Sequence, residues 1–204
     1  TNQNITENTS QIEYFFLPQE NNNWNMNIQS SKYISFIEST IKLTSSYTVL
    51  NFKNIVNNSD LRQNQNVFLT NSLFWKTAFD THLNFENTFT YQFSKSKSEF
   101  QSAFINKLWK NTFKIIFKPS KNLFFNLSSE YLLPNTEQPN LSFFFLDANL
   151  IYIPKSKKWN ASFTINNLTN VNVFEQVQTS DISTTIYKSD LIPRYFLLNL
   201  TRYF

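Results

Sequence analysis

The chain has 204 residues, a formal net charge of +4 and 18% aromatic residues, with no cysteine and no glycine. Even its longest apolar runs, such as the "FFFL" of residues 143–146, are far shorter than the roughly 18 residues that a membrane-spanning helix needs, so such a helix is excluded. The lack of cysteine excludes disulfides and thiolate metal sites, and the scattered basic residues do not favour binding to nucleic acid.

Alternation of polar and apolar residues predicts about ten β-strands. In chain order, their expected ranges are 11–17, 24–35, 39–52, 66–76, 81–95, 101–118, 121–133, 142–153, 159–168 and 191–204. The alternation is clearest in 81–95, where Leu83, Phe85, Phe89 and Tyr91 share one face and mostly polar residues occupy the other. Strands with one apolar and one polar face predict an antiparallel sheet.

The predicted connections tend to alternate in length. Short connections are expected at 77–80, 119–120 and 154–158, and long ones at 53–65, 134–141 and 169–190, while the short 96–100 breaks the trend. Tight periplasmic turns alternating with longer extracellular loops are typical of outer-membrane barrels, whose strands are apolar outside and polar inside. We therefore expect an all-β, antiparallel transmembrane β-barrel.

Aromatic residues on the apolar face gather near both ends of the predicted strands. If the chain ends in the periplasm, the periplasmic ends carry Trp75, Tyr152, Trp159 and Phe204, and the opposite ends carry Tyr91, Phe93, Tyr131, Phe144 and Phe196. Outer-membrane barrels carry such aromatic girdles at both interfaces. The alternative is a soluble β-sandwich, such as an adhesin, in which the aromatic residues cap the core.

The last quarter of the chain carries two motifs. "WNASFTINNLTN" contains Asn167, Leu168 and Asn170, and "LIPRYFLLNLTRYF" begins its strand with Pro193 and Arg194. The second stretch resembles the assembly signal of outer-membrane barrels, which here consists of Phe196, Leu198, Leu200 and Phe204. Together, the two stretches resemble the C-terminal end of TonB-dependent outer-membrane receptors, although Arg202 stands where that family commonly has tyrosine.

This resemblance implies a 22-stranded barrel in the bacterial outer membrane that imports a nutrient. Residues 1–204 would be the C-terminal part of the transmembrane barrel region, with the plug domain and the remaining strands outside this chain, in the same polypeptide or another. The implied partners are outer-membrane lipid, the barrel-assembly machinery and the energy-coupling TonB complex, the last through segments outside this chain. The substrate is not implied by these motifs.

The residue inventory does not favour catalysis. With one histidine and no cysteine, the chain lacks the usual makings of a catalytic triad or a zinc site, so we expect no enzyme, no metal and no cofactor. His82 is expected on the polar face, where the carboxylates of Glu86, Glu130 and Asp147 would pair with lysines such as Lys110 and Lys114. Two alternatives remain: a structural or porin-like barrel subunit of a larger outer-membrane assembly, and an outer-membrane enzyme.

Overall fold

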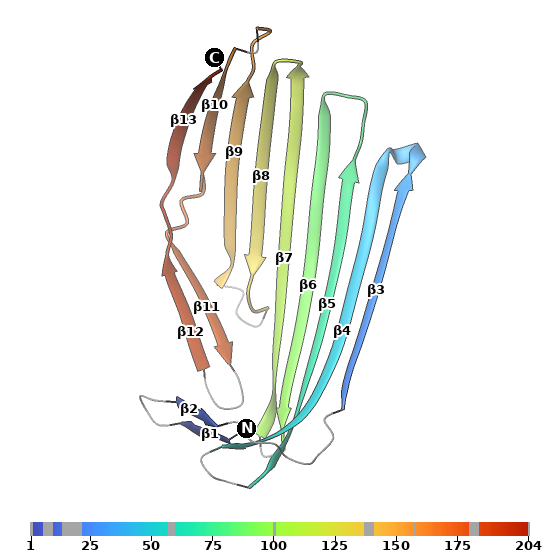
Figure 1. Ribbon diagram of the computed structural model, residues 1–204, viewed down its shortest axis with the longest axis vertical. Helices are drawn as coiled ribbons and strands as arrows, with labels where there is room; N and C mark the ends of the chain where they lie inside the picture. Colours follow the sequence, from blue (N-terminus) through green and yellow to red (C-terminus); the bar gives the residue numbers. More distant parts are fainter. Residues whose placement is uncertain are drawn as a thin grey trace.

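A computed structural model describes residues 2–5, 10–13, 22–56, 60–99, 101–136, 141–156, 158–179 and 184–203 (Figure 1). In these ranges the fold is all-β, apart from the 3₁₀ turn η1 (Ser35–Ile37) and Leu141, which also has 3₁₀ geometry. The first strands are β1 (Asn2–Ile5), β2 (Ser10–Glu13), β3 (Asn23–Ile34), β4 (Ser39–Val56), β5 (Arg62–Thr77), β6 (Leu83–Ser98) and β7 (Gln101–Ser120). They are followed by β8 (Leu123–Leu133), β9 (Phe143–Tyr152), β10 (Trp159–Asn166), β11 (Val173–Thr179), β12 (Thr184–Asp190) and β13 (Tyr195–Arg202).

Nine of these strands form one antiparallel sheet, in the order β3, β4, β5, β6, β7, β8, β9, β10, β13. Neighbours in the sheet are consecutive in the chain except for β10 and β13, which are separated by the β11–β12 hairpin. Strands β1 and β2 form a short hairpin, and β1 runs parallel to the end of β4 through two residue pairs. The all-β antiparallel architecture expected from the sequence is therefore confirmed.

The sheet is open in the described part of the chain. There, β3 pairs only with β4, and β13 pairs only with β10. Because each step across the nine-stranded sheet reverses direction, β3 and β13 run the same way, as their arrowheads show in Figure 1. The two edge strands thus cannot join by antiparallel pairing.

The connections gather at the two ends of the sheet (Figure 1). One end, called here the short-turn end, holds the connections 35–38, 78–82, 121–122 and 153–158. The other, called the long-loop end, holds 57–61, 99–100, 134–142 and 167–194, the last of which includes the β11–β12 hairpin. Only 134–142 and 167–194 are longer than every connection at the short-turn end, so the expected alternation in length was wrong for 57–61, while the short 99–100 is the exception already expected at 96–100.

Several predicted boundaries were wrong. Strands β4 and β5 extend into the range 53–65, which was expected to be a loop, so the connection shrinks to 57–61. Polar side chains there pair across the strands, which a prediction based on apolar alternation does not detect. Residues 119–120 belong to β7, at a register shift between Phe117 and Ser120, and the turn is Lys121–Asn122.

Three further predictions were wrong or fall partly outside the described residues. The expected strand 11–17 is described only as far as Glu13, where it belongs to β2. The range 169–190 is a hairpin, not a plain loop. His82 precedes β6 in a turn, where its carbonyl oxygen accepts a hydrogen bond of 2.6 Å from the Lys118 amide.

The sheet has almost no apolar core of its own. Among the described residues only one large apolar side chain is buried, that of Phe143 at 9% exposure. Its ring lies 4.9 Å from the Phe174 ring, so β9 and the β11–β12 hairpin pack together at the long-loop end. The other large apolar side chains of the sheet are half-buried or exposed.

Candidate functional site: the two faces of the sheet

One face of the sheet is predominantly apolar across all nine strands. Residues paired across neighbouring strands share a face, so the register links Leu73 with Phe89 and Leu127 with Ile115. The same face continues to the terminal strand, where the side chains of Phe196, Leu198 and Leu200 are 60%, 65% and 73% exposed. This apolar face is uncovered by any other described element.

Aromatic residues mark the limits of the apolar face. Towards the long-loop end they are Trp24, Tyr47, Tyr91, Phe93, Trp109, Tyr131, Phe144 and Phe196. Towards the short-turn end they include Trp75, Phe117, Tyr152 and Trp159. Several of these rings touch across strands, as in the edge-to-face pairs Trp24–Tyr47 and Tyr91–Trp109, with centroids 5.6 and 6.0 Å apart.

The long-loop limit runs obliquely across the strands. Following the register from Trp24 leads to Ile105 on β7, and following it from Phe196 leads to Ile115, ten residues further along the same strand. Ten residues correspond to about 34 Å along the strands, and the eight steps from β3 to β13 to about 38 Å across them. The strands are therefore tilted by about 40° from the direction perpendicular to this line of aromatic residues.

The short-turn limit is displaced in the same direction. The register carries Trp75 to Phe113 on β7, whereas Tyr152 pairs with Leu123, beyond the pair formed by Phe117 and Phe125. On each of five successive strands, the apolar face holds a nine-residue span with at least one end at an aromatic residue of these limits. The spans are Val67–Trp75, Leu83–Tyr91, Trp109–Phe117, Leu123–Tyr131 and Phe144–Tyr152. On these five strands the apolar face is thus a slanted band about nine residues wide.

The opposite face carries a row of charged side chains. The register places Lys76, Glu86, Lys114, Ser128 and Asp147 opposite one another on five adjacent strands, so that the charges alternate in sign. The Glu86 carboxylate lies 3.6 Å from the Lys76 ammonium and 3.9 Å from that of Lys114. This charge row crosses the polar face from the short-turn end of β5 to the middle of β9.

A third ion pair lies beside the charge row. The Lys110 Nζ–Glu130 Oε2 distance is 2.8 Å, which places Glu130 and Glu86 with the lysines expected from the sequence. Glu86, Lys114, Glu130 and Asp147 line a hollow of about 290 Å³. Its carboxylates contact ammonium groups or accept hydrogen bonds from backbone amides. We therefore interpret the hollow as part of the polar face of the sheet and not as a pair of acid and base catalysts.

Asn167 forms the corner where the chain leaves β10. Its φ of 54° is left-handed, a conformation that asparagine tolerates better than most residues other than glycine. Its side-chain Nδ2 donates to the Val171 and Ile192 carbonyl oxygens at 2.8 and 3.0 Å, and its Oδ1 accepts from the Val171 amide at 2.9 Å. Its backbone amide donates to Asp147 Oδ1 at 2.7 Å, which joins the corner to the charge row.

The rest of the two motifs continues this corner. Leu168 donates its amide to the Leu146 carbonyl at 2.7 Å. Asn170, with a φ of 57°, accepts a hydrogen bond of 3.0 Å from the Arg194 amide through its side-chain oxygen. Pro193 lies two residues before β13, where its missing N–H leaves no gap in the ladder. The two motifs, over twenty residues apart in sequence, are therefore joined directly.

The residues proposed as an assembly signal occupy one face of β13. Phe196, Leu198 and Leu200 pair with Ile165, Phe163 and Ala161 of β10. Phe204 lies outside the described residues. Sequence reasoning identified these positions by alternation, but it gave no indication of the amide pair Asn87–Asn111 within the apolar band.

Searches of protein-family models, curated proteins and solved structures each gave no match to this chain. The described ranges contain no group of three or more histidine, cysteine, aspartate or glutamate side chains placed to hold a metal ion. No helix in those ranges has the length and apolarity needed to cross a membrane.

Proposed function

We propose that this chain forms part of the wall of a bacterial outer-membrane barrel, specifically of a TonB-dependent receptor that imports a nutrient. The observation that carries the proposal is the slanted apolar band. Strands that cross the outer membrane are about nine to eleven residues long and tilt by about 35–45° from the membrane normal. The nine-residue width and the inclination of about 40° agree with both values.

The distribution of exposed residues supports a lipid-facing role for the band. A soluble sandwich buries the apolar face of each sheet against a second sheet. Here the only buried large apolar side chain of the described residues is Phe143, and the exposed aromatic residues outline the band at both ends. In a bilayer these side chains lie in lipid, and the aromatic rings lie at the interfaces.

The open edges support a wall of more than nine strands. An unpaired strand edge in lipid leaves backbone groups without partners, at several kcal/mol for each group. Single-chain bacterial barrels have even numbers of antiparallel strands. Since β3 and β13 run in the same direction, the nine strands need at least one more strand between them for antiparallel closure.

The receptor assignment rests on the two C-terminal motifs. Their residues, Asn167, Asn170 and Arg194, meet at one corner, so the resemblance involves positions that are far apart in sequence but close in space. A structural or porin-like subunit of a larger assembly is the second candidate. The open sheet favours it equally, because such a subunit would also complete its wall with strands from elsewhere.

Purification of the native protein from outer membranes tests the proposal. We expect extraction to require detergent, mass spectrometry to find a plug domain continuous with these residues, and cross-linking in cells to capture the energy-coupling TonB protein. A detergent-dependent protein with neither a plug nor this cross-link would instead support the porin-like subunit. Solubility without detergent would contradict a membrane barrel of either kind.

A further inference from the structure

A group of lysines lies just beyond the apolar band, on the same face, at the long-loop end. Lys107 pairs with Phe93, Lys95 with Val67, Lys97 with Gln65 and Lys53 with Gln63. From β7 to β4 these lysines lie progressively nearer the long-loop end, and thus follow the slant of the band. At the other limit of this face the described cationic side chains are Lys32 and Arg202, which lie on the two edge strands.

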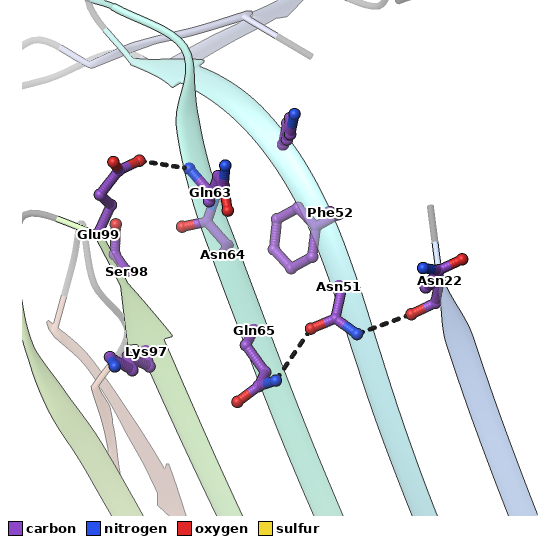
Figure 2. A pocket seen from close by; sticks show the side chains of 10 residues that line it. Asn22, Asn51, Phe52, Gln63, Asn64, Gln65, Lys97, Ser98 and Glu99 are labelled. Atoms are coloured by element: carbon purple, nitrogen blue, oxygen red, sulfur yellow. Dashed lines mark hydrogen bonds between the residues drawn. The ribbon is translucent and has the colours of Figure 1, made fainter. Parts of the chain in front are cut away.

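The lysines adjoin a hollow of about 590 Å³ (Figure 2). Its lining includes the amide side chains of Asn51, Gln63 and Gln65 and the charged side chains of Lys53, Lys97 and Glu99. These six residues occupy the alternate positions that continue the apolar face beyond Val49 and Val67. Phe52, Asn64 and Ser98 of the opposite face also line the hollow, so most of its lining, but not all, lies on the side that carries the apolar band.

The amides of the hollow are held in an ordered chain (Figure 2). Gln65 Nε2 donates to Asn51 Oδ1 at 3.0 Å, and Asn51 Nδ2 donates to the Asn22 carbonyl oxygen at 2.8 Å. Glu99 accepts a hydrogen bond of 3.3 Å from the Gln63 backbone amide. In the described part of the chain, neither Lys53 nor Lys97 forms an ion pair, so both ammonium groups are available to an anion.

We infer that this hollow binds the phosphorylated sugar headgroup of a glycolipid in the outer leaflet, an inference that rests on the proposed membrane location. The four lysines and Glu99 together carry a net charge of +3, and they lie at the level where the headgroups meet the aromatic limit of the band. The lysines supply ammonium groups for phosphate, and the amides supply donors and acceptors for sugar hydroxyl groups. The apolar band below them contacts the acyl chains of the same molecule.

Binding of defined lipids to the native protein in neutral detergent tests this inference. The probes are a diphosphorylated glucosamine-disaccharide lipid, the same lipid without phosphates, and inorganic phosphate. We expect the phosphorylated lipid to bind most tightly. Lys53→Gln/Lys97→Gln should weaken its binding roughly tenfold to thirtyfold, because each lysine near an anionic surface contributes about 1 kcal/mol.

The matched control is Lys32→Gln/Lys121→Gln, which removes the same charge at the short-turn end and should change the affinity less than twofold. Lys53→Arg/Lys97→Arg should retain binding, which separates a charge effect from misfolding. The inference is overturned if wild type and Lys53→Gln/Lys97→Gln bind the phosphorylated lipid equally well. It is also overturned if wild type binds both lipids equally well, or if it binds inorganic phosphate as tightly as the phosphorylated lipid. Solubility without detergent would instead overturn the membrane proposal itself.

Discussion

Asn87 and Asn111 exchange two amide hydrogen bonds of 3.3 Å on the apolar face of the sheet. Their strands place them diagonally, since Asn87 pairs in register with Phe113 and Asn111 with Phe89. Asn87 also donates to the Thr112 carbonyl oxygen at 3.2 Å. These two polar side chains of the apolar band thus satisfy each other.

This amide pair predicts non-additive effects of substitution. Asn111→Leu leaves the Asn87 amide without its side-chain partner, whereas Asn87→Leu/Asn111→Leu removes both amides. We expect the coupling free energy of the double-mutant cycle, measured by urea unfolding in detergent micelles, to be about 1 kcal/mol. Strictly additive effects would show that the amides do not interact.

The two faces of β8 predict a contrast between neighbouring positions. Leu127 lies in the apolar band between Ile115 and Ala148, while Asn126 lies on the polar face between Ile116 and Asn149. Arginine near the middle of a bilayer costs roughly 2–4 kcal/mol on a lipid-facing strand position. Leu127→Arg should therefore lower the free energy of unfolding in lipid vesicles by that amount, and Asn126→Arg by much less. Equal losses would contradict the assignment of the faces.

The alternation of residue types predicted the faces because a strand has a period of two. It placed Phe85, Leu127 and Phe163 correctly on one face, together with the described aromatic residues at the ends of the strands. It also placed Glu86 and Glu130 beside lysines, because residues of one face are neighbours across strands.

The features that prediction missed depend on pairing between strands. The polar ends of β4 and β5 form regular ladders although their side chains alternate weakly, as with Asn51 opposite Gln65. The β11–β12 hairpin was missed for the same reason. The slant of the band and the lysines that follow it become visible only when the register aligns all nine strands.

The corner at Asn167 predicts a loss of stability that can be divided into two parts. Asn167→Ala removes three side-chain hydrogen bonds and places a β-carbon in a left-handed conformation, so we expect a loss of roughly 2–4 kcal/mol. Asn167→Gly removes the same bonds but tolerates the positive φ, and should cost about 1 kcal/mol less. Urea unfolding of the two variants measures the difference, and a more stable alanine variant would contradict the left-handed geometry.

The topology predicts different accessibility at the two ends of the sheet. Ser189 lies on the β11–β12 hairpin at the long-loop end, and Ser156 lies in the 153–158 turn at the short-turn end; both are exposed. Because the chain has no cysteine, Ser189→Cys and Ser156→Cys each introduce a single thiol. On intact cells, a membrane-impermeant thiol reagent should label only Ser189→Cys. Labelling of Ser156→Cys alone would reverse the orientation, and equal labelling of both without lysis would contradict a membrane-spanning sheet.

The two edges of the sheet predict how the wall is completed. Direct closure would join β3 and β13 as parallel neighbours, whereas every other neighbouring pair in the nine-stranded sheet is antiparallel. We therefore expect β13 to pair with a strand outside residues 1–204. A photoreactive side chain at Leu198, in the middle of β13, should cross-link to that outside strand when the native protein is irradiated in the membrane, and mass spectrometry of the product should identify a peptide absent from this chain.

A disulfide test asks the same question of the two edge strands. Ile28→Cys/Leu198→Cys, with one cysteine near the middle of each edge strand, should form no intramolecular disulfide under oxidising conditions. As a positive control, Phe163→Cys/Leu198→Cys places both cysteines at directly paired positions of β10 and β13 and should form one. A disulfide between positions 28 and 198 would show that the nine strands close on themselves, which would replace the receptor wall with a small self-contained barrel.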